Sequence, residues 1–325
     1  MAKAIFNPNG FTRGFSLLPK HGDRTATVRE AVHDGDTVTV EADGSFSIRL
    51  LGVDTPEVSF EFPKLPGDPR SETFRSITEF QQYLSDPFNP DFQGSQAYEK
   101  QLGDKLLRYL KPKLNSQTAS NHHEYAIAAQ RELERIIEFD VNERIYQGEK
   151  FRFFMAFAYE IMDRYGRFLC YVDRDNKPIE REGRLTYNEK MLKSGLAIPY
   201  FIWPNINPFR KQGSLLEAVP APEKFKDFVN KDKRTKIVRN FVKDARSDGI
   251  GVFDKQNPLI LMPFELRYLA RRSKPDRYVL DMSKNTPKLL KPTDYYLIPN
   301  EEDRLFVDEH FVQLFQKKGY QIENR

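Results

Sequence analysis

Apolar and polar residues alternate along the chain from Thr25 onwards, and this period of two is typical of half-buried β-strands. Turn residues interrupt the alternation at Asp34-Gly35 and at Ala42-Asp43-Gly44. The pattern predicts a meander of three strands: Thr27–Val32, Thr37–Val40 and Phe46–Leu50. Two later apolar runs predict strands on either side of a hairpin: Phe151–Tyr159 and Phe168–Val172. Five-stranded OB barrels begin with a meander of this kind.

Other segments carry apolar residues at helical spacing, with charged residues on the opposite face. The predicted helices are Gln96–Leu110, Ala126–Ile137, Tyr187–Ser194, Thr235–Arg246 and Val307–Lys317. Lys111-Pro112 ends the first of them because proline cannot continue a helix, and Gly195 closes the third. His122-His123 has no cysteine or spaced carboxylate partner for zinc, and we expect it to lie in a loop.

Composition places the chain among globular proteins with a polar surface, at 39% hydrophobic and 30% charged residues. Its 325 residues allow one large decorated domain or two domains. The net charge is only +4, so any attraction to nucleic acid must come from a local patch. One cysteine, Cys170, excludes an internal disulfide, and its apolar run predicts a buried, inert thiol. With no signal peptide pattern, we expect a cytoplasmic protein.

Candidate chemistry is concentrated around the third predicted strand. The residues concerned are Asp36, Arg49, Asp54 and Glu57, with Arg167 more than a hundred positions later. Carboxylate oxygens suit a hard cation such as calcium or magnesium, and guanidinium groups match phosphate geometry. Together these side chains suit a cation held beside a phosphate while water attacks it.

Each of these residues also has an ordinary structural interpretation. Asp36 in an Asp-Gly-Asp sequence is by itself most often part of a turn, and Asp54 alone fits a turn and a metal site equally well. Glu57, after a Thr-Pro pair, is a common choice at a helix N-terminus. Arg49 and Arg167 fit exposed, solvated positions. Only the combination favours chemistry.

Three motifs occur in a fixed order: Asp34-Gly35-Asp36-Thr37, then Arg49-Leu50-Leu51 followed by Val53-Asp54-Thr55-Pro56-Glu57, then Tyr165-Gly166-Arg167. In this order they resemble the staphylococcal nuclease (thermonuclease) family. Asn188-Glu189 and the Gly195–Ala197 run resemble that family's second helix and its exit. The resemblance implies a calcium-dependent phosphodiesterase on a small OB-type barrel with helices, acting on DNA and/or RNA and leaving 3′-phosphate ends.

The resemblance also assigns roles to residues. It implies calcium bound by the carboxylates of Asp36 and Asp54 and by the backbone carbonyl of Thr55. Glu57 takes the position of the candidate general base, which abstracts a proton or only positions the water. The family pattern places Arg49 and Arg167 against the scissile phosphate. Tyr165 and Trp203 are candidates for contact with the nucleotide, and for Trp203 an ordinary core position is equally favoured.

These considerations predict a mainly β fold with helices, of the α+β class. Residues 1–24 form a lead-in, residues 25–254 form the OB-type domain, an insertion occupies about 61–124, and residues 255–325 are an extension of unknown role. The alternative to an enzyme is a non-catalytic OB module that binds nucleic acid or protein. The complete set of acids and arginines argues against that alternative. A third possibility is that the insertion and the extension cover the site and restrict its substrate.

Overall fold

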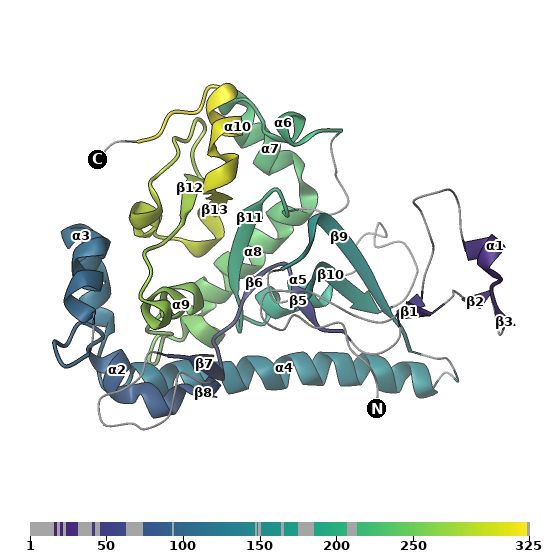
Figure 1. Cartoon of the computed structure of the whole chain (residues 1–325), viewed down its shortest axis with the longest axis horizontal. Helices are drawn as coiled ribbons and strands as arrows, with labels where there is room; N and C mark the ends of the chain where they lie inside the picture. Colours follow the sequence, from purple (N-terminus) through teal and green to yellow (C-terminus); the bar gives the residue numbers. More distant parts are fainter. Residues whose placement is uncertain are drawn as a thin grey trace.

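The computed structural model of the chain describes residues 16–17, 20–21, 24–31, 41–42, 46–62, 74–92, 94–146, 148, 151–163, 166–174, 185–206 and 213–323. The expected strand Thr37–Val40 and the site residues Asp36 and Tyr165 lie outside these described residues. The described part is an α+β structure, as expected, but the expectation that it is mainly β is wrong, because helix exceeds strand (Figure 1).

Two sheets meet along one chain segment. The first has the order β5-β10-β9, formed by Ile48–Leu50, Phe168–Arg174 and Phe153–Met162. In it β10 is parallel to β5 and antiparallel to β9. The second has the order β12-β13-β11-β6, formed by Arg277–Asp281, Arg304–Asp308, Ile198–Trp203 and Gly52–Asp54. Only Leu51 separates β5 from β6, so one segment belongs to both sheets.

Smaller strand pairs complete the sheets: β1 (Ser16–Leu17) with β4 (Glu41–Ala42), β2 (Lys20–His21) with β3 (Arg24–Thr25), and β7 (Ser59–Glu61) with β8 (Phe74–Ser76). The α-helices are α1 (Val28–Ala31), α2 (Gln81–Ser85), α3 (Ser95–Leu110), α4 (Thr118–Tyr146), α5 (Tyr187–Lys193), α6 (Leu215–Ala218), α7 (Phe225–Lys231), α8 (Lys233–Asp248), α9 (Pro263–Arg271) and α10 (Val312–Lys317). Among the described helices, none is both long and apolar enough to cross a lipid bilayer.

Most predicted helices and strands are present with shifted ends. The helices α3, α5 and α8 and the strands β9 and β10 match their predicted ranges closely, whereas α4 is longer than Ala126–Ile137 at both ends. The expected final helix Val307–Lys317 is only half correct, because β13 runs to Asp308 and α10 begins at Val312. Leu305, Phe306 and Val307 are all buried. A short, fully buried strand of this kind has no alternation that distinguishes it from a helix.

The expected strand Thr27–Val32 is wrong where the structure describes it, because Val28–Ala31 forms the short helix α1. Local side-chain bonds explain the difference. The Glu30 carboxylate accepts a hydrogen bond from the Thr27 backbone N–H at 2.8 Å, and the Thr27 hydroxyl accepts one from the Glu30 N–H at 3.4 Å. This reciprocal arrangement is a capping box, which starts a helix. The alternating apolar pattern did not reveal it.

The second sheet lies between two hydrophobic cores. On β11, Phe201 and Trp203 face one core while Tyr200 faces the other. The first core also contains residues of α5, α8 and α10, and the second joins the insertion to the extension. In the second core Phe80 and Leu106 of the insertion lie with residues of α9, and the Tyr83 hydroxyl donates to the Leu269 carbonyl at 2.8 Å. The insertion and the extension therefore pack as one unit.

The expected barrel is not seen as a closed sheet within the described residues, where the two sheets share a segment but stay separate. Figure 1 shows α4 running beneath both sheets, with β7, β8 and α2 of the insertion at one of its ends. The same helix carries residues that reach the β5–β6 segment, as described below.

Candidate functional site

The β5–β6 segment is held in place by one buried amide. Asn188, at the start of α5, donates through Nδ2 to the carbonyls of Leu51 at 2.8 Å and Cys170 at 3.2 Å. Its Oδ1 accepts from the Val172 N–H at 2.9 Å. Leu51 lies between the two sheets and Cys170 and Val172 lie on β10. A single side chain therefore fixes the break between β5 and β6 against the neighbouring strand.

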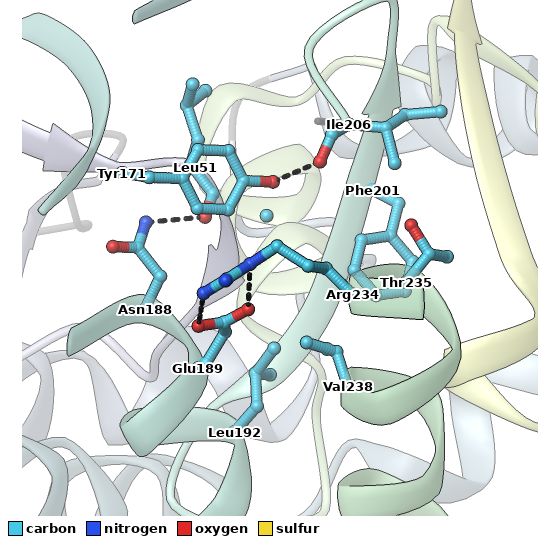
Figure 2. Close-up of a pocket in the computed structure, with 11 residues that line it drawn as sticks. Leu51, Tyr171, Asn188, Glu189, Leu192, Phe201, Ile206, Arg234, Thr235 and Val238 are labelled. Atoms are coloured by element: carbon cyan, nitrogen blue, oxygen red, sulfur yellow. Dashed lines mark hydrogen bonds and ion pairs between the residues drawn. The ribbon is translucent and has the colours of Figure 1, made fainter. Parts of the chain in front are cut away.

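A small cavity lies behind this break (Figure 2). Its volume is about 20 Å³, which is room for about one water molecule. In the figure Asn188 points to the Leu51 carbonyl and Arg234 of α8 forks onto Glu189 of α5. The cavity is too small for a substrate. Its ion pair and amide support the site strand from behind.

Asp54 ends β6 and is almost completely buried, at 2% exposure. Its Oδ1 accepts from Nη2 of Arg49 at 3.2 Å. Both of its oxygens also accept from Arg267 of α9, through Nη1 and Nη2, at 2.8 Å each. A buried carboxylate is stable only with such partners. Asp54 is thus shared between two guanidinium groups.

Glu57 lies three residues further on and joins the same cluster. Its Oε1 accepts from Nη1 of Arg267 at 3.1 Å. Burial raises the pKa of Glu57, an effect that Arg267 opposes and the charge of Asp54 reinforces. A carboxylate with a raised pKa beside charged groups is a common arrangement for a catalytic base.

The backbone N–H of Glu57 is bound by a residue that we expected in a loop. His122 instead lies in α4, fully buried, and its Nε2 accepts from the Glu57 N–H at 2.8 Å. Burial lowers the pKa of His122 to about 4, so the ring is neutral at pH 7. A neutral ring with Nε2 as acceptor carries its proton on Nδ1. His122 therefore holds the backbone of Glu57 and adds no charge.

Arg167 lies in the hairpin turn between β9 and β10, directly before β10 begins. Asp163 accepts from its Nε at 2.8 Å and from its backbone N–H at 3.0 Å, which orients the guanidinium. In the parallel pair of β5 and β10, Leu169 lies opposite Arg49. Arg167 is two residues before Leu169 in the chain, so it lies close to Arg49. About a third of the Arg167 side chain is exposed. The two arginines are thus brought to the same part of the surface.

Two hollows meet at these arginines. The motif hollow, of about 410 Å³, is lined by the site residues and by the face of α4, and includes Arg49, Asp54, Thr55, Glu57 and Arg167. The arginine cleft, of about 440 Å³, is lined by five arginines: Arg49, Arg167, Arg267, Arg271 and Arg277. Four carboxylates line the cleft as well: Glu160, Asp163, Asp276 and Asp308. Arg49 and Arg167 belong to both hollows.

The structure brings together Arg49, Asp54, Thr55, Glu57 and Arg167, but it places Trp203 elsewhere. The Trp203 ring is 1% exposed and packs edge-on against Phe311 and Phe315. It therefore contributes to a core in this structure and offers no face for stacking on a nucleotide. Asp36 and Tyr165 lie outside the described residues.

Of the three expected calcium ligands, the structure describes Asp54 and Thr55. No cluster of three or more histidine, cysteine, aspartate or glutamate side chains suited to a metal occurs in the part of the chain that the structure describes. Of the expected ligands, Asp54 has both oxygens occupied by Arg267. The described residues in this arrangement therefore do not fit a calcium ion at Asp54.

Sequence reasoning missed three residues of the site: Asn188, His122 and Arg267. For Asn188 the sequence offers only its part in the resemblance. His122 is expected in a loop because it has no partners for zinc, whereas it lies on the buried side of α4. Arg267 is separated from Asp54 by 213 residues, and the surrounding segment carries no recognisable motif. Only the packing of α9 against the sheet reveals its role.

Comparisons with known proteins give little further guidance. No family model and no solved structure matches the chain. An uncharacterized protein of Methanocaldococcus jannaschii is 29% identical over 175 residues, which cover 52% of this chain and 56% of that protein. The match thus spans about half the length of each protein. That relative has no named activity.

Proposed function

We propose that this protein is a nuclease of the staphylococcal type, which hydrolyses phosphodiester bonds of DNA and/or RNA. The observation that carries the proposal is the gathering of Arg49, Glu57 and Arg167 around one hollow, although Arg167 comes from a distant hairpin. Two partly exposed guanidinium groups beside a partly exposed carboxylate are the groups needed to bind a phosphate and direct water at it. The motifs that carry the family resemblance contain these same residues.

In this proposal Arg49 and Arg167 bind the scissile phosphate and stabilise the charge that grows on its oxygens. Glu57 orients a water molecule or takes its proton. The water oxygen forms a bond to phosphorus as the bond to the 5′ oxygen breaks. The leaving oxygen takes up a proton, and a 3′-phosphate end remains. Arg271 also lines the arginine cleft, where a neighbouring phosphate of a bound strand would lie.

The OB-type barrel remains part of the proposal. The parallel pairing of β5 with β10 and the β9–β10 hairpin join three of the predicted strands in one sheet, which supports this part of the proposal. The antiparallel pairing of β6 with β11 adds two strands that the sequence did not predict. The calcium site at Asp36, Asp54 and Thr55 is implied by the resemblance alone. We assign no step to a metal, because Asp54 is occupied by Arg267 in the structure.

One observation favours the alternative of a non-catalytic binding module. Arg49, Asp54, Glu57 and Arg267 satisfy one another in a closed set of ion pairs. Charges paired internally in this way also serve simply to hold α9 on the sheet. Cleavage of a phosphodiester distinguishes the two functions directly.

The deciding experiment measures cleavage of single-stranded DNA, duplex DNA and RNA by the full chain and by Glu57→Gln and Arg167→Ala. We expect each variant to lose at least about 100-fold in rate, because each removes a group that acts in the transition state. Arg135→Ala is the matched control, since Arg135 pairs with Glu132 on the exposed side of α4. Unchanged rates in both site variants would show that Glu57 and Arg167 do not carry the cleavage and would overturn the proposal. Binding without cleavage by the unaltered chain would favour the binding module.

A further inference from the structure

Arg267 reaches the site from the extension and covers the whole carboxylate of Asp54. Its two terminal nitrogens donate to the two oxygens of Asp54 at 2.8 Å each, and Nη1 also donates to Glu57 at 3.1 Å. The Arg267 side chain is only 12% exposed. A forked, two-bond contact of this kind is the strongest form of an arginine–carboxylate pair. The guanidinium thus lies where a cation shared by the two carboxylates would be.

The helix that carries Arg267 is firmly anchored. The fully buried Glu265 accepts from Lys113 of the insertion at 2.9 Å and from the Tyr295 hydroxyl at 2.8 Å. Phe264 stacks on Tyr200 of β11, with ring centroids 5.6 Å apart. Arg267 therefore extends from a helix that is fixed on both sides, and its guanidinium cannot leave Asp54 by a simple movement of α9.

The charge of Arg267 is also fixed. A guanidinium is always protonated in proteins, so Arg267 carries its positive charge against Asp54. A calcium ion at Asp54 would either lie against this buried positive charge or displace it from its partner. Both outcomes are unfavourable, because a buried charge without a partner is strongly destabilising.

We propose that Arg267 takes the place of the divalent cation at Asp54, so that the chain supplies its own cation to the site and Asp54 binds no calcium while Arg267 is present. The contribution of Arg267 to hydrolysis rests on the proposed function. The exclusion of calcium does not, because calcium binding is measured without any substrate.

The test is calorimetric titration of the full chain with calcium chloride, together with terbium luminescence. We expect no binding that depends on Asp54 in the unaltered chain at millimolar calcium. Arg267→Met removes the charge and keeps most of the volume of the side chain. It should create a site at Asp54, so that the variant binds calcium at least 10-fold more tightly than the unaltered chain. The double variant Asp54→Asn with Arg267→Met should lose that site.

Arg267→Lys and Arg271→Met serve as matched controls. Lysine keeps a positive charge at Asp54 and should still exclude calcium, and Arg271 lies on the same helix without a hydrogen bond to Asp54. Circular dichroism verifies that each variant is folded, and Arg267→Gln replaces Arg267→Met if the latter is not. Calcium binding by the unaltered chain that Asp54→Asn abolishes would overturn the proposal. A folded, uncharged variant at position 267 that binds no calcium would overturn it as well.

Discussion

Individual residues decide how the site is held, and His122 shows how much one buried ring contributes. The ring accepts a hydrogen bond from the backbone N–H of Glu57, the residue that we propose as the base. The two residues are 65 positions apart in the chain. The ring must stay neutral to accept this hydrogen bond through Nε2. Its ability to hold Glu57 therefore depends on pH.

We predict that the protein loses stability in acid through His122. The pKa of this histidine is about 4 in the folded chain and about 6.5 when exposed, so the unfolded chain binds more protons between these values. Stability from the neutral ring is fully present above pH 6.5 and falls as the pH drops towards 4, by about 3 kcal/mol in total. Urea unfolding at a series of pH values measures this.

The comparison that isolates the effect uses two variants of adjacent residues. His122→Gln has no titrating ring and should show a flatter dependence between pH 6.5 and 4, whereas His123→Gln should keep the dependence of the unaltered chain. Equal slopes in all three proteins would show that other groups cause the acid sensitivity.

At this scale the sequence predicted the side chains that a short motif contains. Arg49, Asp54 and Glu57 lie within nine positions of one another, so the motif that they form is recognised from the sequence alone. Arg167 is recognised as part of a turn motif. Arg267 is not recognised from the sequence, because only the tertiary fold brings it to its partner Asp54. An arginine on an amphipathic helix is ordinary.

At the scale of elements, the contact between α5 and the end of α8 depends on two glycines. Gly195 ends α5 with a φ of +70°, and its carbonyl accepts from the Val252 N–H at 2.8 Å. Gly251 has a φ of +62°, and a Cβ at this position would collide with the Gly195 carbonyl oxygen. The two backbones therefore approach more closely than any side chain allows.

We predict that Gly251→Ala is much more destabilising than an alanine at another glycine with positive φ. Gly94 is the matched control, since its φ is +81° and the nearest atom to an added Cβ is 3.7 Å away. Gly94→Ala should cost about 1–2 kcal/mol from backbone strain alone. Gly251→Ala should cost about 1–3 kcal/mol more, because the strands and helices around it must move. Chemical unfolding of both variants tests this, and equal losses would contradict the close contact.

The elements themselves were predicted well where their pattern was long and regular. Segments such as Thr235–Arg246 show a clear apolar face, and the structure has α8 there. The failures were short segments. Val28–Ala31 is a helix because of a capping box, and the residues of β13 are a strand because both faces are buried. Periodicity alone carries no information in either case.

At the scale of the whole molecule, the insertion and the extension are separate along the chain but pack together. The insertion and the extension share one core, and the extension adds β12 and β13 to the sheet that contains β6. The sequence divides the chain into these parts. It did not show that they fold against each other, because their contacts join positions more than a hundred residues apart.

We predict that the two cores unfold together. Trp203 is the single tryptophan and lies in the first core, so its fluorescence reports on that core alone. Leu266→Ala changes the second core, where Leu266 is fully buried, and should lower the free energy of unfolding by about 2–5 kcal/mol. The urea midpoint seen by Trp203 should fall accordingly. Leu297→Ala is the control, because Leu297 is 39% exposed, and it should leave the midpoint nearly unchanged. An unchanged midpoint in Leu266→Ala would show that the cores unfold separately.

The pairing of β11 with β13 also bears on how the chain is made. Phe201 of β11 is paired with Leu305 of β13. One edge of β11 therefore has no neighbouring strand until more than a hundred further residues have been synthesised. Contacts between such distant positions form slowly, and an open strand edge is a template for pairing with other chains. A newly made molecule therefore passes through a period in which β11 is exposed to other copies of itself. This edge is covered only when β13 has been synthesised and pairs with β11.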